Sequence, residues 1–91
     1  MKHVDGEDKG DITLYTLSTC GWCKKTKRLL SELGVRYNYI DVDLLEGKEQ
    51  QDILEEMKRH NPKCTFPTLV MGKDKCIIGF KDNEIKEALG T

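Results

Sequence analysis

Hydrophobic and polar positions repeat with two different periods along the chain, and they predict strands interleaved with helices. Segments rich in β-branched and aromatic residues are typical of strands and lie at 11–17, 35–42, 68–71 and 75–78. Apolar residues spaced three or four apart are typical of helices and lie at 21–33, 46–59 and 82–89. Residues 1–10 are polar, so we expect a loose tail or a short lead-in there and a domain over 11–91.

The order of these elements, β-α-β-α-β-β-α, predicts an α/β fold. A strand, helix and strand in succession form a right-handed crossover, so the first two strands are expected to be parallel. The last two strands are close in sequence and are expected to form an antiparallel hairpin. The order therefore predicts a four-stranded mixed sheet with helices on both faces.

Composition narrows the classes of protein that the chain can belong to. Its 91 residues fit one domain, and its net charge of −1 lacks the basic excess that is typical of nucleic-acid binders. No apolar run approaches the roughly 20 residues that a membrane-spanning helix needs. The first ten residues also lack the apolar stretch of a secretory signal. We therefore expect a cytoplasmic monomer that has neither nucleic acid nor membrane as a partner.

A C-x-x-C motif, Cys20 to Cys23, stands where the first strand passes into the first helix. Such a motif near a β-α-β pattern indicates redox chemistry. Cys20 would lie at the helix N-terminus, where free N–H groups, the helix dipole and the nearby Lys24 and Lys25 favour a thiolate. Cys23 lies one turn later on the apolar stripe and should be more buried. We predict that Cys20 is the nucleophile and that Cys23 resolves the mixed disulfide.

Two further cysteines, Cys64 and Cys76, lie in the second half of the chain. Free cysteines most often pack as small hydrophobic residues, and we expect that here, although Cys64 could instead be a regulatory thiol. The spacing of this pair, C-x11-C, differs from the second close pair of zinc ribbons. No metal site is therefore expected.

Two other segments carry recognisable motifs, namely Thr65-Phe66-Pro67-Thr68 before the third strand and Gly79-Phe80-Lys81-Asp82 before the last helix. Together with the YTLSTC strand and the CGWC motif, they cover about residues 11–90 and resemble the glutaredoxins of the thioredoxin superfamily. The resemblance implies the thioredoxin-like glutaredoxin fold and a disulfide oxidoreductase activity. It also implies a cis peptide bond before the proline of the TFP segment, facing the active-site cysteines.

The resemblance further implies a substrate groove beside the cysteines. Phe66 would offer its backbone to an incoming thiol-bearing chain as a short antiparallel contact. The amides that begin the last helix, near Lys81 and Asp82, could hold a carboxylate. Trp22 is either an apolar platform for the substrate or a plain surface aromatic. The expected substrate-binding residues are Trp22, Thr65, Phe66, Pro67, Gly79, Phe80, Lys81 and Asp82.

Several electron donors fit the resemblance, which implies disulfide-containing protein substrates and no tightly bound cofactor. Glutathione or another small thiol would be the reductant. However, many glutathione-using members carry a lysine where this chain has Leu17, and Pro-Tyr where it has Gly21-Trp22. The Gly79-Phe80-Lys81 segment instead looks like members that are reduced by thioredoxin reductase and supply ribonucleotide reductase.

A second function is the binding or transfer of a [2Fe–2S] cluster. Some glutaredoxins hold such a cluster between two protomers through the first active-site cysteine and a small external thiol, and thiolates are suitable ligands. Gly21 resembles the residue that follows the first cysteine in those members. The presence of Cys23 favours the dithiol redox role over this alternative.

Overall fold

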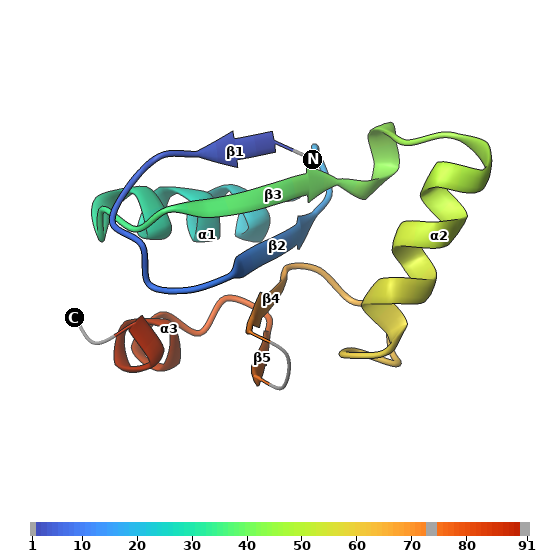
Figure 1. The fold of residues 1–91 in the computed structure, drawn as a ribbon. Coiled ribbons are helices and arrows are strands. Elements are labelled where there is room, and N and C mark those ends of the chain that lie inside the picture. The colour runs from blue at the N-terminus through green and yellow to red at the C-terminus, as the bar shows by residue number, and fades with distance from the viewer. Residues whose placement is uncertain (1, 73–74, 90–91) are drawn as a thin grey trace.

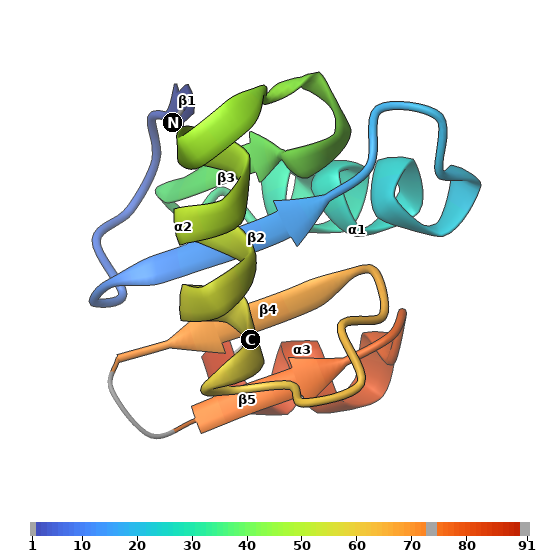
Figure 2. The ribbon, with the colours of Figure 1, turned by 90° about the vertical axis from the view of Figure 1, so that its right-hand side faces the viewer.

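A mixed sheet with helices on both faces forms the frame of the protein (Figures 1 and 2). The computed structural model describes residues 2–72 and 75–89. The strands β1 to β5 span Lys2–Val4, Ile12–Thr16, Tyr37–Asp41, Thr68–Met71 and Lys75–Ile78. The helices α1, α2 and α3 span Gly21–Glu32, Gly47–Lys58 and Asp82–Leu89, and a short 3₁₀ helix, η1, covers Val42–Leu44.

The pairing of the strands follows the predicted topology. The sheet has the order β1-β3-β2-β4-β5, with β2 parallel to β3 and antiparallel to β4. Strands β4 and β5 form the antiparallel pair expected of a hairpin, and the turn at 73–74 lies outside the described residues. The first β-α-β unit and the final strand pair are thereby confirmed.

The number of strands differs from the prediction, because residues near the N-terminus form a fifth strand. In β1, Val4 lies opposite Tyr37 at the outer edge of β3. The chain stays attached beyond β1, since the Glu7 backbone donates to Gly34 at 2.7 Å and accepts from Arg36 at 2.9 Å. The expectation of a loose tail is therefore wrong for this segment. Its polar sequence concealed the strand, because a mostly exposed edge strand needs no alternation of apolar residues.

The core has two parts, one on each face of the sheet. Because successive strand residues point to opposite faces, Leu14 packs with α1 and α3 while Tyr15 packs under α2. The first part includes Leu14, Leu30, Leu69 and Ile85, and the second includes Tyr15, Ile40, Met57 and Val70. Figure 2 shows α2 crossing in front of the sheet, with α1 and α3 behind it. The predicted helices on both faces are thus confirmed.

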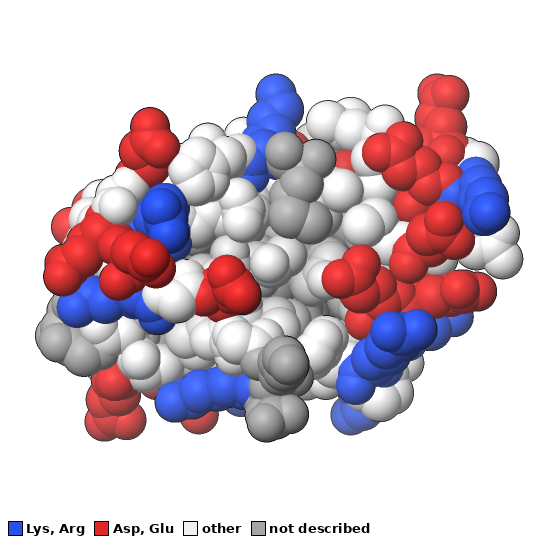
Figure 3. All heavy atoms as spheres, viewed as in Figure 1, with Lys and Arg blue, Asp and Glu red and all other residues white. Residues whose placement is uncertain are grey.

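The outer side of α2 is charged. Figure 3 shows acidic side chains gathered on the part of the molecule where α2 lies, with basic side chains among them. The exposed acidic residues of this helix are Glu49, Asp52, Glu55 and Glu56. The charges are therefore on the solvated face of an amphipathic helix. Within residues 2–72 and 75–89, no helix has the length and apolar content to cross a membrane.

The attachment of β1 gives a test at Gly6, which lies against the chain between α1 and β3. A Cβ atom at this position would stand 2.5 Å from the carbonyl carbon of Val35. We expect Gly6→Ala to push the N-terminal segment away and to lower the free energy of unfolding by about 1–3 kcal/mol. Urea denaturation measures this change. Asp5→Ala is the control, because it removes only an exposed contact with His3, and exposed ion pairs contribute little to stability. Unchanged stability in Gly6→Ala, with β1 still paired by NMR, would contradict this packing.

Candidate active site

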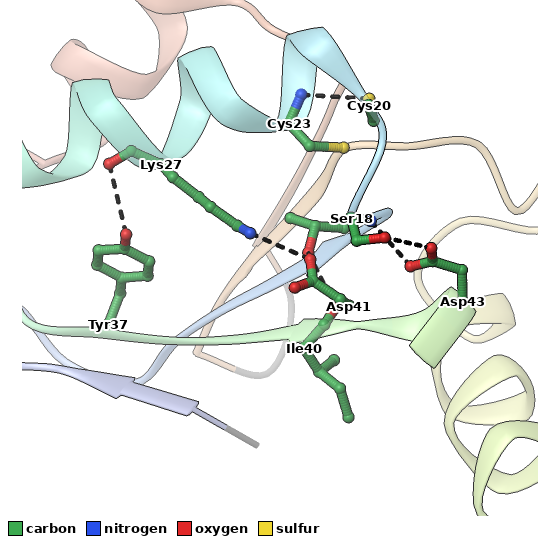
Figure 4. A network of polar contacts seen from close by, with 9 residues as sticks. Ser18, Cys20, Cys23, Lys27, Tyr37, Ile40, Asp41 and Asp43 are labelled. Carbon is green, nitrogen blue, oxygen red and sulfur yellow. Dashed lines mark hydrogen bonds and ion pairs between the residues drawn. The ribbon is translucent and has the colours of Figure 1, made fainter. Parts of the chain in front are cut away.

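The loop that leads from β2 into α1 is held by a carboxylate from η1. Asp43 accepts hydrogen bonds from both the backbone N–H and the hydroxyl of Ser18, the first at 2.8 Å (Figure 4). These bonds lower the pKa of the Asp43 carboxyl below its ordinary value of 3.8. The Cys20 backbone N–H then donates to the Leu17 carbonyl at 3.1 Å. The position of Cys20 is therefore set by contacts between the segments that follow β2 and β3.

Cys20 is the N-cap residue of α1, as the sequence predicts. Its Sγ accepts a hydrogen bond from the backbone N–H of Cys23 at 3.2 Å (Figure 4). A donor at a helix N-terminus stabilises a negative charge on the sulfur atom. Lys24 and Lys25 are exposed on the first turn, and the Lys25 ammonium lies 4.5 Å from the centre of the Trp22 ring. Their influence on the Cys20 thiolate remains a prediction.

Cys23 differs from Cys20 in its surroundings, because its side chain is 0% exposed. Burial, together with its hydrogen bond with Cys20, raises the pKa of the Cys23 thiol to about 12. The positive charge of Lys27 acts in the opposite direction. Both cysteines are free thiols, and Figure 4 shows their sulfur atoms at the same end of α1. The predicted contrast between a more accessible and a buried cysteine is confirmed.

A groove next to the cysteines joins three segments that are far apart in sequence. Its volume is about 260 Å³, and its lining comprises Trp22, Phe66, Pro67, Gly79 and Phe80. The Phe66–Pro67 bond is cis, as the resemblance implied. The Gly79 backbone N–H donates to the Pro67 carbonyl at 2.8 Å, which joins two of the segments. Trp22 is 57% exposed and stacks on Phe80 at 5.8 Å between ring centroids, so it forms a wall of the groove.

Three of the expected substrate-binding residues make local contacts instead of lining the groove. The hydroxyl and carbonyl oxygens of Thr65 accept hydrogen bonds from the Asn61 amide at 3.1 and 3.2 Å. Lys81 forms an ion pair with Glu84 at 3.7 Å. The Asp82 carboxylate accepts a hydrogen bond from the next backbone N–H at 2.9 Å. These contacts shape the ends of the groove, and direct substrate binding by these three residues stays a prediction.

A polar network beneath α1 was not predicted from the sequence. Lys27 donates to the Asp41 carboxylate at 3.0 Å, and the same oxygen accepts from the Thr16 hydroxyl (Figure 4). The Thr16 hydroxyl also donates to the Ile40 carbonyl at 3.1 Å. One signal could have indicated Lys27, since it follows Cys23 by four residues and therefore shares its helix face.

The remaining two cysteines pack as the sequence predicts. Cys64 and Cys76 are partly buried against the core under α2. Burial raises the pKa of the Cys76 thiol. In the part of the chain that the structure describes, no group of three or more His, Cys, Asp or Glu side chains is arranged to hold a metal ion. The regulatory role considered for Cys64 remains untested.

Comparison with known proteins places this site in a family. The glutaredoxin family model matches residues 12–77. The chain belongs to the glutaredoxin family. This glutaredoxin is 52% identical to a glutaredoxin from Methanosarcina mazei Go1, with a TM-score of 0.93 over 99% of this chain and 87% of that one. It is 50% identical to the methanoredoxin of Methanosarcina acetivorans, with a TM-score of 0.95 over 100% of this chain and 96% of that one.

A more distant relative is the glutaredoxin-like NrdH-redoxin of Escherichia coli. It is 26% identical, with a TM-score of 0.68 over 85% of this chain and 92% of that one. Family membership confirms the thioredoxin-like fold that the CGWC and TFP motifs implied. It also makes this glutaredoxin a disulfide oxidoreductase, an enzyme that exchanges electrons between thiols and substrate disulfides.

The contact between Asp43 and Ser18 predicts a pH dependence. A carboxyl whose pKa is lowered by folding stabilises the fold above its unfolded pKa, and this stabilisation is lost as the pH falls through the folded pKa. Asp43→Asn should therefore be less stable than the wild type near neutral pH. The difference should disappear in acid, where the wild-type carboxyl is also neutral.

Urea denaturation of both proteins between about pH 7 and about pH 2 measures this difference. Asp52→Asn is a matched control, because it removes the same charge from an exposed position on α2. A stability difference for Asp43→Asn that stays constant over the whole pH range would show that the ionised carboxylate does not hold the loop.

Proposed function

We propose that this glutaredoxin reduces protein and small-molecule disulfides by a dithiol exchange through Cys20 and Cys23. The Cys20 thiolate attacks a substrate sulfur, which forms a mixed disulfide and releases one substrate thiol. Cys23 then attacks Cys20, releases the second substrate thiol and leaves a Cys20–Cys23 disulfide. The two cysteines thus supply both electrons. The observation that carries this proposal is the pairing of the N-cap sulfur of the partly exposed Cys20 with the buried Cys23.

The groove supports recognition of an extended peptide around the reactive sulfur. In the described chain, no hydrogen bond occupies the backbone N–H or C=O of Phe66. Phe66 also lines the groove beside the cysteines. An extended substrate segment can pair with these free groups as a short antiparallel strand. The aromatic walls made by Trp22 and Phe80 favour an apolar side chain next to the substrate cysteine.

The electron donor for this cycle is glutathione, another low-molecular-weight thiol or thioredoxin reductase. The five groove residues carry no charged side chain, and Lys81 is already paired with Glu84. Leu17 also stands where many glutathione-using members carry a lysine. Since glutathione carries two carboxylates, these features favour a donor other than glutathione.

The candidate protein partners are indicated by the similarity to NrdH-redoxin and by the segment after β5. The NrdH-redoxin has a thioredoxin-like activity profile, and its overall fold is similar to this one. The Gly79-Phe80-Lys81 segment resembles members that supply ribonucleotide reductase. We therefore include thioredoxin reductase among the donors and ribonucleotide reductase among the candidate substrates, and we place the reaction in the cytoplasm.

Serine variants of the cysteines test the dithiol cycle. Cys20→Ser should abolish the reduction of a model disulfide, because the nucleophile is lost. Cys23→Ser should accumulate a mixed disulfide on Cys20, visible by mass spectrometry, because the resolving thiol is lost. Cys64→Ser is the control and should keep the wild-type rate. Full dithiol activity in Cys20→Ser would exclude the assignment.

The choice of donor is tested by installing the missing positive charge. Oxidised wild-type protein should be reduced more slowly by glutathione than by an uncharged small thiol or by thioredoxin reductase. Leu17→Lys should accelerate reduction by glutathione on the order of threefold, because a cation beside the site attracts its carboxylates. The rate with the uncharged thiol should not change. Leu44→Lys adds the same charge at an exposed position outside the groove. Equal responses of both variants would refute the argument.

A further inference from the structure

A half-buried ion pair lies one helical turn beyond Cys23, between α1 and β3 (Figure 4). The side chains of Lys27 and Asp41 are only 24% and 15% exposed, and their charged atoms are 3.0 Å apart. The Lys27 ammonium also lies 4.2 Å from the centre of the Tyr39 ring. Removing two charges from water is costly, and the attraction between them often fails to offset that cost. The pair therefore contributes little to the stability of the fold. Its importance lies in its position next to Cys23.

The location of Lys27 brings its positive charge under the active-site turn. Residues four apart on a helix are neighbours on one face, with Cβ atoms about 5–6 Å apart. Figure 4 shows the side chains of Cys23 and Lys27 both pointing from α1 toward the sheet. Burial raises the pKa of the Cys23 thiol, and the Lys27 charge lowers it. Lys27 thus favours the ionised form of the Cys23 thiol, whereas burial favours its protonated form.

We propose that Lys27, held in place by Asp41, is a positioning residue for the resolving step, in which its ammonium stabilises the Cys23 thiolate. This inference rests on the dithiol cycle proposed above. Cys23 first releases its proton to solvent. Its sulfur then bonds to Cys20 and is oxidised, while the bond between Cys20 and the substrate sulfur breaks. The substrate sulfur leaves reduced, as a thiolate, and takes up a proton from solvent.

Other charged and titratable groups around Cys23 act on this balance. Cys20 is the nearest, but in the mixed disulfide its sulfur is bonded to the substrate and carries no charge. From β3 and η1 come Asp41 and Asp43, of which Asp43 is engaged by Ser18. The carboxylate of Asp41 opposes the ionisation of Cys23, and Lys27 promotes it. The two ends of the ion pair should therefore have opposite effects on the resolving step.

This opposition gives the test. Lys27→Met should slow the resolving step at about pH 7 by roughly threefold to tenfold and move its pH dependence upward. Asp41→Asn keeps a side-chain oxygen that can accept the hydrogen bond from Lys27 but removes the negative charge, so it should move the pH dependence downward. Lys27→Arg should restore the wild-type profile, because it keeps the positive charge. Arg28→Gln is the matched control, since Arg28 is exposed on the same helix and its loss should leave the profile unchanged.

Two measurements report on the resolving step. Stopped-flow absorbance with a chromogenic aromatic disulfide separates the first thiol release, due to Cys20, from the second, due to Cys23. The experiments use a Cys64→Ser, Cys76→Ser background so that only Cys20 and Cys23 can react with the disulfide. A pH titration of the Cys23 ¹³Cβ chemical shift follows its ionisation directly.

The outcomes separate this inference from the proposed function. No thiol release by the background protein would overturn the dithiol cycle itself. Normal release with identical pH profiles in Lys27→Met and Arg28→Gln would overturn only the role of Lys27. Shifts of Lys27→Met and Asp41→Asn in the same direction would also overturn it, because a merely structural pair would weaken the site alike from either end. Opposite shifts in both the kinetics and the NMR titration support it.

Discussion

The parallel pairing of β2 with β3 fixes the polar groups that lie under the first turn of α1. In this register Thr16 is directly opposite Asp41, so the two strands end together at one edge of the sheet. One strand continues through Ser18 into α1 and the other into η1, which brings Ser18 to Asp43. A slip of β3 by one residue would turn the Asp41 side chain to the opposite face of the sheet, away from Thr16. The positions of the two cysteines thus depend on the register between β2 and β3, the strands that lead into this part of the chain.

The groove depends on a second long-range contact, between the TFP segment and the segment after β5. Gly79 has a backbone φ of +86°, which residues with a Cβ atom rarely adopt. Its N–H donates a hydrogen bond to the Pro67 carbonyl. This contact places Phe80 next to Gly79 so that its ring stacks on the Trp22 ring. The resulting surface is aromatic, and the Phe66 backbone groups on it have no hydrogen-bond partner among the described residues. The proposed substrate is therefore one that is recognised by backbone shape and apolar contact more than by charge.

The two cysteines show how one short motif supports two different roles. Cys20 caps the helix, and its sulfur accepts a hydrogen bond from the backbone N–H of Cys23. Cys23 is withdrawn from water, which favours its neutral form. A difference of one pKa unit corresponds to about 1.4 kcal/mol, so a single nearby charge such as that of Lys27 is sufficient to alter the resolving step. The half-buried ion pair provides that charge at a fixed place.

The sequence by itself determined the features that are local. The three-residue spacing of Cys20 and Cys23 at the end of a strand predicted the N-cap sulfur and its buried partner. Apolar periodicity likewise predicted the three helices and four of the strands. The TFP and GFKD segments, through a family resemblance, indicated most of the groove.

Only the tertiary structure decided which distant residues meet. Lys27 and Asp41 are 14 positions apart, and Ser18 and Asp43 are 25 apart. No local pattern joins such residues, because their contact depends on strand register and on how α1 packs against the sheet. Strand β1 was missed for a related reason, since it is attached by hydrogen bonds to β3 and only Val4 among its side chains packs against the core. Periodicity reports how each segment is buried, whereas the partners of a buried polar group are set by the folded arrangement of the whole chain.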